Sequence, residues 1–436
     1  MTLVQPRRSR SHTGRLVRAL LITGFAATSS CSRTERMVPP VSRAPAATLP
    51  TEAEIRDLDI QFYAERVKGD PNGAANLARL ASLYLQRSRE TGDPRDAIRA
   101  EQAARRSMRN RDAHNTQAMQ VLSSSLLAQH RFVEALRVAR DVRDRNPDVP
   151  ALRAAVAEIE MELGQYDSAR VTFAALGDAK SNLSVAPRLA RWAEVRGHPD
   201  EARRLIRNAL AVALKDPSLP REQVAWFWLR SGDIELRTGK FAAADSAYRS
   251  GLAAHPGDYR LLAAMCHLAS VEHRWADAIE YGEAAVASNL DPATLGMLSD
   301  AYAAVGDTTR SEEFARVLDV AVSKQPGAYH RAWSLFLLDH DRHVGTVYKK
   351  IRTELATRKD VYGYDLLAWA LHKRGRDREA ADAMTIALSQ GTQDAQLFYH
   401  AGIIERSQGH ADIADQFLAR ARSLNSQLDG VRLATR

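Results

Sequence analysis

The densest group of potential metal ligands in the sequence is formed by Asp339, His340, Asp341 and His343. Carboxylate oxygens and imidazole nitrogens are competent ligands for zinc or manganese. Ligands on one face of a helix are three or four positions apart, a spacing that His340 and His343 meet, whereas consecutive residues point to different sides. The pattern therefore favours a polar turn between two helices, and we predict no metal site.

A second group combines aromatic and charged side chains at helical spacing. Tyr362, Asp365, Trp369 and His372 follow one another at steps of three, four and three, so they share one stripe of a helix. The packing stripe of the same segment is a separate set: Tyr364, Leu367, Ala368 and Leu371. Exposed aromatic side chains beside charges are typical of binding hot spots. We therefore expect Trp369 to be exposed and to bind a partner; the alternative is burial between neighbouring elements.

Known catalytic and cofactor signatures are missing from the sequence. It contains no GxxxxGK[ST] phosphate loop, no HExxH, no GxSxG and no CxxC motif. Cys266 lies in the apolar stretch AAMCHLAS, which favours a small buried residue over a reactive thiol. We predict a protein that is not an enzyme, with no catalytic residue and no cofactor. A metal-dependent enzyme using His340 and His343 remains a remote third hypothesis.

Composition limits the class of protein. The 436 residues are 45% hydrophobic and 26% charged and include two cysteines, which excludes a disulfide scaffold. Such a length suggests two or three domains or one extended array. The net charge is +8, but residues 1–30 hold five arginines and no acid, so the rest carries only +3. A nearly neutral body predicts no nucleic-acid partner.

The N-terminal segment, residues 1–30, has the order of a signal peptide. Arginines between Arg7 and Arg18 precede the short apolar run ALLITGFAA, small residues follow, and Cys31 comes next. This order resembles the lipobox of bacterial lipoproteins, although Thr28 stands where that family usually has leucine. The resemblance implies a lipid on Cys31; the alternative is a plain secretory signal. Residues 31–50, rich in Pro, Ala, Ser and Thr, are expected to form a disordered tether.

The remainder of the sequence repeats itself at a nearly constant period. Small residues form a ladder, and the differences between their successive numbers are 38, 34, 33, 42, 34, 33, 34, 35 and 34. Its rungs are Ala97, Ala135, Ala169, Ala202, Ala244, Ala278, Ser311, Gly345, Ala380 and Ala414. Glycines that can end a helix recur between the rungs: Gly164, Gly197, Gly239, Gly306, Gly375 and Gly409. Small residues are expected in the ladder because they let two helices approach closely. Glycines are expected between the rungs because they adopt the left-handed conformation that a turn requires.

The clearest unit, residues 225–258, resembles the tetratricopeptide repeat (TPR), a helix–turn–helix of about 34 residues. Trp228, Gly232, Gly239, Ala244 and Tyr248 take the family's characteristic places. The resemblance implies an all-α protein, a right-handed α-solenoid (superhelix) of about ten TPR helix–turn–helix repeats. We expect an N-terminal helix at 51–71, the superhelix at 72–426 with contacts between neighbouring repeats only, and a short tail at 427–436.

In that family, ligands are contacted from fixed places on the first helix of each repeat, facing the concave groove. The resemblance therefore implies a protein-binding groove lined by Trp226, Asp233, Arg237, His267, Asp300, Tyr362, Asp365, Trp369, His372, Lys373, Tyr399 and Arg406. No activity follows from the family. The expected function is a non-enzymatic protein–protein interaction scaffold of the bacterial cell envelope.

The expected location is the periplasmic or cell-surface face of a membrane, which is the outer membrane in a diderm organism. The expected partner is a segment of another envelope protein, and contact with the membrane is expected through the N-terminal lipid only. The alternative function is a self-assembling accessory of an envelope assembly or secretion complex. Few residues remain after Leu424 to cap the array, so we expect a partly apolar C-terminal face that could self-associate.

Overall fold

The computed structural model describes residues 50–177, 182–323 and 331–427. The chain divides into two units, Met1–Leu49 and Pro50–Arg436, and only the second contains described residues. The predicted signal peptide at 1–30, Cys31, nearly all of the tether and most of the tail lie outside them. Within the described ranges no helix is long and apolar enough to cross a membrane.

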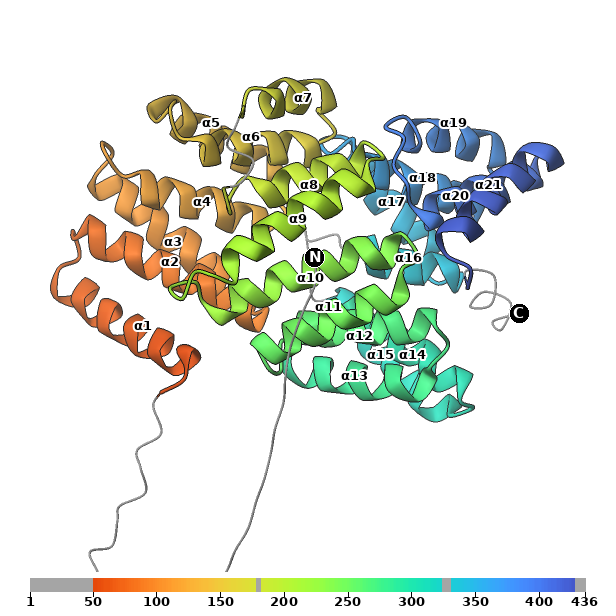
Figure 1. The fold of residues 1–436 in the computed structure, drawn as a ribbon, viewed down its shortest axis with the longest axis horizontal. Helices are drawn as coiled ribbons and strands as arrows, with labels where there is room; N and C mark the ends of the chain where they lie inside the picture. Colours follow the sequence, from red (N-terminus) through yellow and green to blue (C-terminus); the bar gives the residue numbers. More distant parts are fainter. Residues whose placement is uncertain (1–49, 178–181, 324–330, 428–436) are drawn as a thin grey trace, which may run out of the picture. The chain divides into compact units, whose positions relative to one another are not determined.

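The described residues form helices throughout, joined by short turns (Figure 1). The first half contains α1 (Glu52–Gly69), α2 (Ala74–Thr91), α3 (Pro94–Asn110), α4 (Thr116–Ala128), α5 (Phe132–Arg145), α6 (Pro150–Glu162), α7 (Tyr166–Ala174), α8 (Ala186–Val195), α9 (Pro199–Ala213) and α10 (Arg221–Arg237). The second half contains α11 (Phe241–Ala254), α12 (Tyr259–Val271), α13 (Trp275–Ser288), α14 (Pro292–Ala304), α15 (Thr308–Ser323), α16 (Arg331–Asp339), α17 (Val344–Leu355), α18 (Val361–His372), α19 (Asp377–Ala387), α20 (Ala395–Ser407) and α21 (Ala411–Leu424).

Each even-numbered helix from α2 onward packs against the helix that follows it, and each pair packs against the next. The predicted all-α solenoid of about ten helix–turn–helix repeats is therefore confirmed. Capping side chains stabilise the starts of several of these helices. Thr51 and Glu54 form a capping box on α1, and the side chains of Asp258, Asp360 and Asp394 accept backbone N–H groups at the starts of α12, α18 and α20.

The ladder of small residues marks the close contacts between helices. The rungs that are completely or almost completely buried are Ala97, Ala135, Ala169, Ala202, Ala244, Ala278, Ala380 and Ala414. Gly345 differs: a Cβ built there would meet only the Arg374 guanidinium within 4 Å, so this rung is not a close-packing position. In its repeat, Asp341 and His343 both have positive φ angles, which distorts the turn between α16 and α17.

The recurring glycines all have positive φ angles between +69° and +86°, as the sequence predicted. In addition, three of them touch a distant part of the chain. A Cβ on Gly164, Gly197 or Gly239 would lie 2.2–2.4 Å from the carbonyl oxygen of, respectively, Lys359, Gly391 or Leu424. Only glycine permits these approaches, since no Cβ atom fits so near a backbone oxygen. By contrast, a Cβ on Gly375 would meet nothing within 4 Å.

These approaches belong to a contact between successive turns of the superhelix, which we call the seam. Five of the side-chain hydrogen bonds between the turns join residues 194–198 positions apart, and two more join residues 169 and 171 positions apart. The Lys359 amide donates to the Leu163 carbonyl at 3.0 Å, and the Val361 amide donates to the Tyr166 hydroxyl at 2.8 Å. The expectation that only neighbouring repeats touch is therefore wrong. That separation along the chain corresponds to one superhelical turn, after which the chain meets itself.

Buried charge reinforces the seam. Arg358, only 7% exposed, donates to the backbone carbonyl of Glu162 at 3.0 Å and to the Glu354 carboxylate at 3.0 Å. Its guanidinium also lies 4.4 Å from the centre of the Phe132 ring. Because a buried guanidinium needs several acceptors, these contacts fix the relative position of the two superhelical turns.

Candidate functional site

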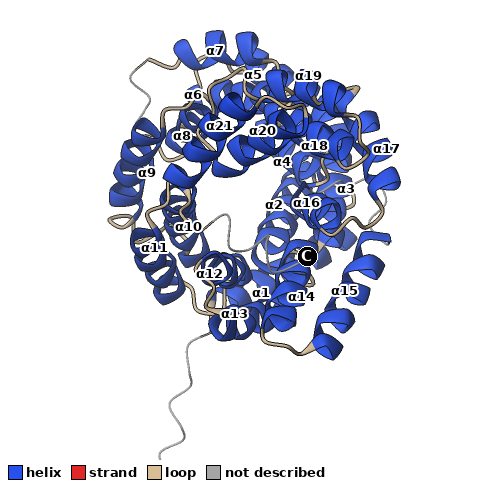
Figure 2. Ribbon diagram, turned by 90° about the vertical axis from the view of Figure 1, so that its right-hand side faces the viewer, coloured by secondary structure: helices blue, strands red, loops and turns tan. Residues whose placement is uncertain are grey.

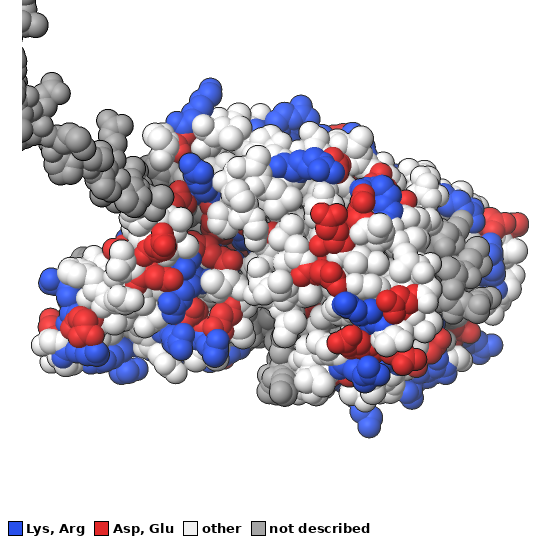
Figure 3. Space-filling view, turned by 90° about the horizontal axis from the view of Figure 1, so that it is seen from below, with Lys and Arg blue, Asp and Glu red and all other residues white. Residues whose placement is uncertain are grey.

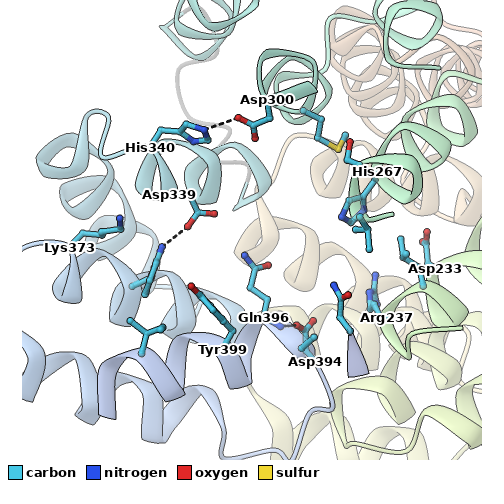
Figure 4. Close-up of a pocket in the computed structure, with 18 of the residues that line it drawn as sticks. Asp233, Arg237, His267, Asp300, Asp339, His340, Lys373, Asp394, Gln396 and Tyr399 are labelled. Carbon is cyan, nitrogen blue, oxygen red and sulfur yellow. Dashed lines mark hydrogen bonds and ion pairs between the residues drawn. The ribbon is translucent and has the colours of Figure 1, made fainter. Parts of the chain in front are cut away.

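The second superhelical turn encloses a cavity of about 680 Å³ (Figure 4). Its wall comes from α10, α12, α13, α14, α18 and α20, together with the end of α16 and the turn that follows it. Asn425, after α21, completes the wall close to the place where Leu424 meets Gly239. The helices consequently form a ring whose last element returns to its first; Figure 2 shows them arranged around an open centre.

Eight of the twelve predicted groove residues line this cavity. They are Asp233, Arg237, His267, Asp300, Trp369, His372, Lys373 and Tyr399. They belong to several repeats and span most of the second turn. The superhelix therefore brings side chains of α10 and α20 to one space, although α10 ends at Arg237 and α20 begins at Ala395.

The other four predicted residues do not line it. Trp226 packs edge-on against Phe227 within an apolar cluster. The Tyr362 ring lies below the Arg191 guanidinium at 5.1 Å, in a separate small recess. Asp365 is 4% exposed and sits 2.7 Å from His400. The remaining residue, Arg406, pairs with Asp415 on the surface, at 2.8 Å.

Trp369 lies in the wall of the cavity, but the expectation of an exposed ring is wrong, since it is only 5% accessible. Its Nε1–H donates to Asp339 Oδ1 at 2.8 Å, and its ring stacks on His400 at 4.2 Å between centroids. The Lys373 ammonium lies 5.4 Å from the ring centre. Curvature of the repeats presses the indole between α16, α18 and α20, so much of its contact serves packing.

The residues that resembled a metal cluster separate into different contacts. His340 Nε2 lies 2.7 Å from Asp300 Oδ1, while Asp341 pairs with Lys373 at 2.9 Å. His343 faces Asp319 at 3.6 Å, away from the cavity. Among the described residues no group of three or more His, Cys, Asp or Glu side chains is arranged to hold a metal ion.

Two histidines of the wall have opposite electrostatic environments. Enclosure by protein lowers the pKa of His267, even though its ring faces the cavity. His340 is also desolvated, yet its pKa is raised, because Asp300 and the Phe336 carbonyl both accept from its ring. The two rings that face the cavity are therefore shifted in opposite directions.

Several residues that line the cavity were not predicted as groove residues from the sequence. Examples are Trp275, Met297, Asp339, His340, Asp341, Asp394, Gln396, Ile403 and Asn425. Many of them stand at helix ends or in turns, outside the first-helix positions that the family resemblance selects. For the α20 residues a signal did exist. Gln396, Tyr399 and Ile403 are spaced i, i+3 and i+7 and so form one stripe.

A comparison of the sequence with known families supports the repeat assignment directly. The tetratricopeptide repeat model matches residues 126–191, from the end of α4 into α8. None of the curated proteins matches the sequence.

Among solved structures, PilW, a widely conserved type IV pilus biogenesis factor, is similar at 18% identity and a TM-score of 0.41, over 51% of this chain and 99% of PilW. PilF of Pseudomonas aeruginosa is similar at 14% identity and a TM-score of 0.39, over 51% of this chain and 96% of its own. The Cut9–Hcn1 hetero-tetramer of the APC/C is similar at 11% identity and a TM-score of 0.33, over 88% of this chain and 96% of the matched chain. The repeat model covers residues 126–191, and helix pairs of the same kind continue on both sides of them, as expected for a tetratricopeptide repeat α-solenoid.

Proposed function

We propose that this protein is a non-enzymatic interaction scaffold of the bacterial cell envelope that holds a segment of a partner protein in the cavity of its second superhelical turn. The cavity itself carries the proposal. Its volume of about 680 Å³ lies within the roughly 300–1,000 Å³ of typical binding sites. Aromatic, aliphatic and charged side chains line it together, a mixture that supplies both burial and orientation.

Placement in the envelope is supported by the N-terminal sequence alone. The basic, apolar and small-residue order of residues 1–30 is that of an exported chain, and Cys31 is the proposed site of the lipid. The anchor would leave the repeats on the periplasmic or cell-surface side. Figure 3 shows basic and acidic side chains intermingled over one face, which offers no continuous basic surface to a nucleic-acid backbone.

Photocrosslinking in cells tests the cavity. A photoreactive amino acid replaces Gln396 in the cavity wall or, as the matched control, Thr385 on the exposed side of α19. We expect a partner segment to be crosslinked from position 396 and not from position 385. Equal products from both positions, or none from position 396, would refute the proposal.

Trp369→Ala and Asp365→Ala are poor probes of binding. Trp369 is mostly buried, and Asp365 contacts His400 outside the cavity. Both substitutions would disturb packing as well as any ligand contact, so loss of partner capture would have two explanations.

A second candidate function, self-assembly, is favoured by one observation on α1. Ile55, Leu58 and Phe62 are 48%, 58% and 54% exposed at i, i+3 and i+7, so they form an uncovered apolar stripe. By comparison, α21 exposes Ile413 among charged residues, so the larger apolar stripe lies at the N-terminal end. Sedimentation should show self-association that Leu58→Asp abolishes and Ile413→Asp preserves; a monomer at all concentrations would eliminate this candidate.

A further inference from the structure

The charges that line the cavity are unequal. Its wall contains five aspartates, Asp233, Asp300, Asp339, Asp341 and Asp394, against two permanently cationic side chains, Arg237 and Lys373. Among these seven side chains the acidic ones exceed the basic ones by three, although Asp233 also pairs with Arg230 outside the wall, at 2.9 Å. In a concave site such an excess favours a cationic occupant.

The two cations of the wall are already engaged. Arg237 donates to Glu194, which is behind the wall, at 2.6 Å. Lys373 pairs with Asp341 at 2.9 Å, and its ammonium also lies against the Trp369 ring. Neither side chain is therefore available to neutralise an acidic ligand without breaking an existing contact.

Asp394 differs from the other carboxylates. Its Oδ1 accepts the backbone amide of Gln396 at 2.9 Å, which caps α20. Across the described residues no Lys, Arg or His nitrogen forms an ion pair with it. Beside it, Gln396 and Tyr399 supply an amide and an aromatic ring to the cavity (Figure 4), and Ile403, on the same stripe, adds an apolar surface to its lining.

From these contacts we infer that the start of α20 forms a subsite for a lysine or arginine side chain of the partner segment, with Asp394 as its counter-ion and Tyr399 as its aromatic face. Lys373 provides an internal precedent, since a carboxylate and an aromatic ring of the same wall already hold that ammonium. The inference rests on the proposed function, because it names the chemistry of the segment that the cavity holds.

The substitution Asp394→Asn tests the counter-ion without removing the helix cap, because asparagine caps helices as well as aspartate. The matched control is Asp291→Asn, at another aspartate cap that neither lines the cavity nor forms an ion pair with a described residue. In the full-length chain carrying the photoreactive residue at 396, we expect Asp394→Asn to lower the crosslinking yield about tenfold and Asp291→Asn to leave it unchanged.

Mass spectrometry of the crosslinked partner supplies a second readout. We expect the crosslinked residues to lie within two or three positions of a lysine or arginine. In addition, a short arginine peptide should compete with the partner, whereas its neutral citrulline counterpart should not. Unchanged yield in Asp394→Asn, or a crosslinked segment without a basic residue, would overturn the subsite while the scaffold function stands. Absence of any product from position 396 would overturn both.

Discussion

Replacing Gly164 by alanine should open the seam between the two superhelical turns. The new Cβ would stand 2.2 Å from the Lys359 carbonyl oxygen, about 1 Å inside an ordinary contact, and both sides of the contact are backbone. The positive φ of +76° adds the cost of a left-handed alanine, about 1 kcal/mol. Relieving the overlap costs about 1–3 kcal/mol more, as in other overpacked sites.

Gly375→Ala is the matched control, since its φ of +69° is similar and its Cβ would meet nothing within 4 Å. We expect about 1 kcal/mol of destabilisation from the control and about 2–4 kcal/mol from Gly164→Ala. The difference between the two variants isolates the contribution of the seam.

Hydrogen exchange of single amides measures this effect without assuming two-state unfolding, which long repeat arrays can violate. The Lys359 and Val361 amides donate across the seam, to the Leu163 carbonyl and the Tyr166 hydroxyl. Their protection should fall at least tenfold in Gly164→Ala and stay unchanged in Gly375→Ala. Equal destabilisation by both substitutions, together with intact protection of Lys359, would refute the reasoning.

Three further predictions concern buried polar groups. Arg358→Met should lower the free energy of unfolding in urea by about 3 kcal/mol, because it leaves buried acceptors unpaired, whereas Arg376→Met, at a more exposed ion pair, should cost much less. The pKa of His340 is raised in the folded protein because the contact with Asp300 outweighs the opposing effect of desolvation. The protonated ring therefore stabilises the fold fully below the unfolded pKa, and this stabilisation is lost as the pH rises through the folded pKa. The free energy of unfolding should therefore fall as the pH rises from about 6.5, the pKa in the unfolded chain, through the raised pKa of the folded state, and it should fall less in His340→Gln. Burial raises the pKa of the Cys266 thiol to about 12, so a thiol reagent should label it only after unfolding, in a chain whose other cysteine is serine.

Each of these predictions has a contrary result. Equal losses from the two arginine variants would mean that the seam does not depend on buried charge. A pH profile unchanged by His340→Gln would remove the Asp300 contact as its cause. Rapid labelling of Cys266 in the native protein would show that its repeat opens readily.

The helix pairs could be predicted from the sequence because their causes are local. Close packing within a pair requires small residues such as Ala244 and Ala278 at a regular period, and the turns require a left-handed residue such as Gly239. Both requirements appear directly as residue types at fixed spacing. For the same reason, the weak rung at Gly345 corresponds to a distorted repeat in the structure.

Which residues line the cavity could be predicted only in part from the sequence. Eight of the residues chosen from first-helix positions line the cavity, among them His267 and Tyr399. The family pattern treats all first helices alike, whereas curvature hides some of their positions and exposes turn residues such as Asp341 and Asp394. Trp369 shows the same limit, because its burial depends on how tightly α18 and α20 approach each other.

By itself, the sequence therefore determined the helices, their pairing and the period of the repeat, all of which depend on residues within about 40 positions of each other. Only the tertiary structure decided the pitch of the superhelix, the seam and the closed ring around the cavity. Those features depend on a small rotation added at each repeat until residues 196 positions apart, such as Glu162 and Arg358, come into contact. Gly164 illustrates both levels, since its type marks a turn while its closeness to Lys359 follows from the accumulated rotation.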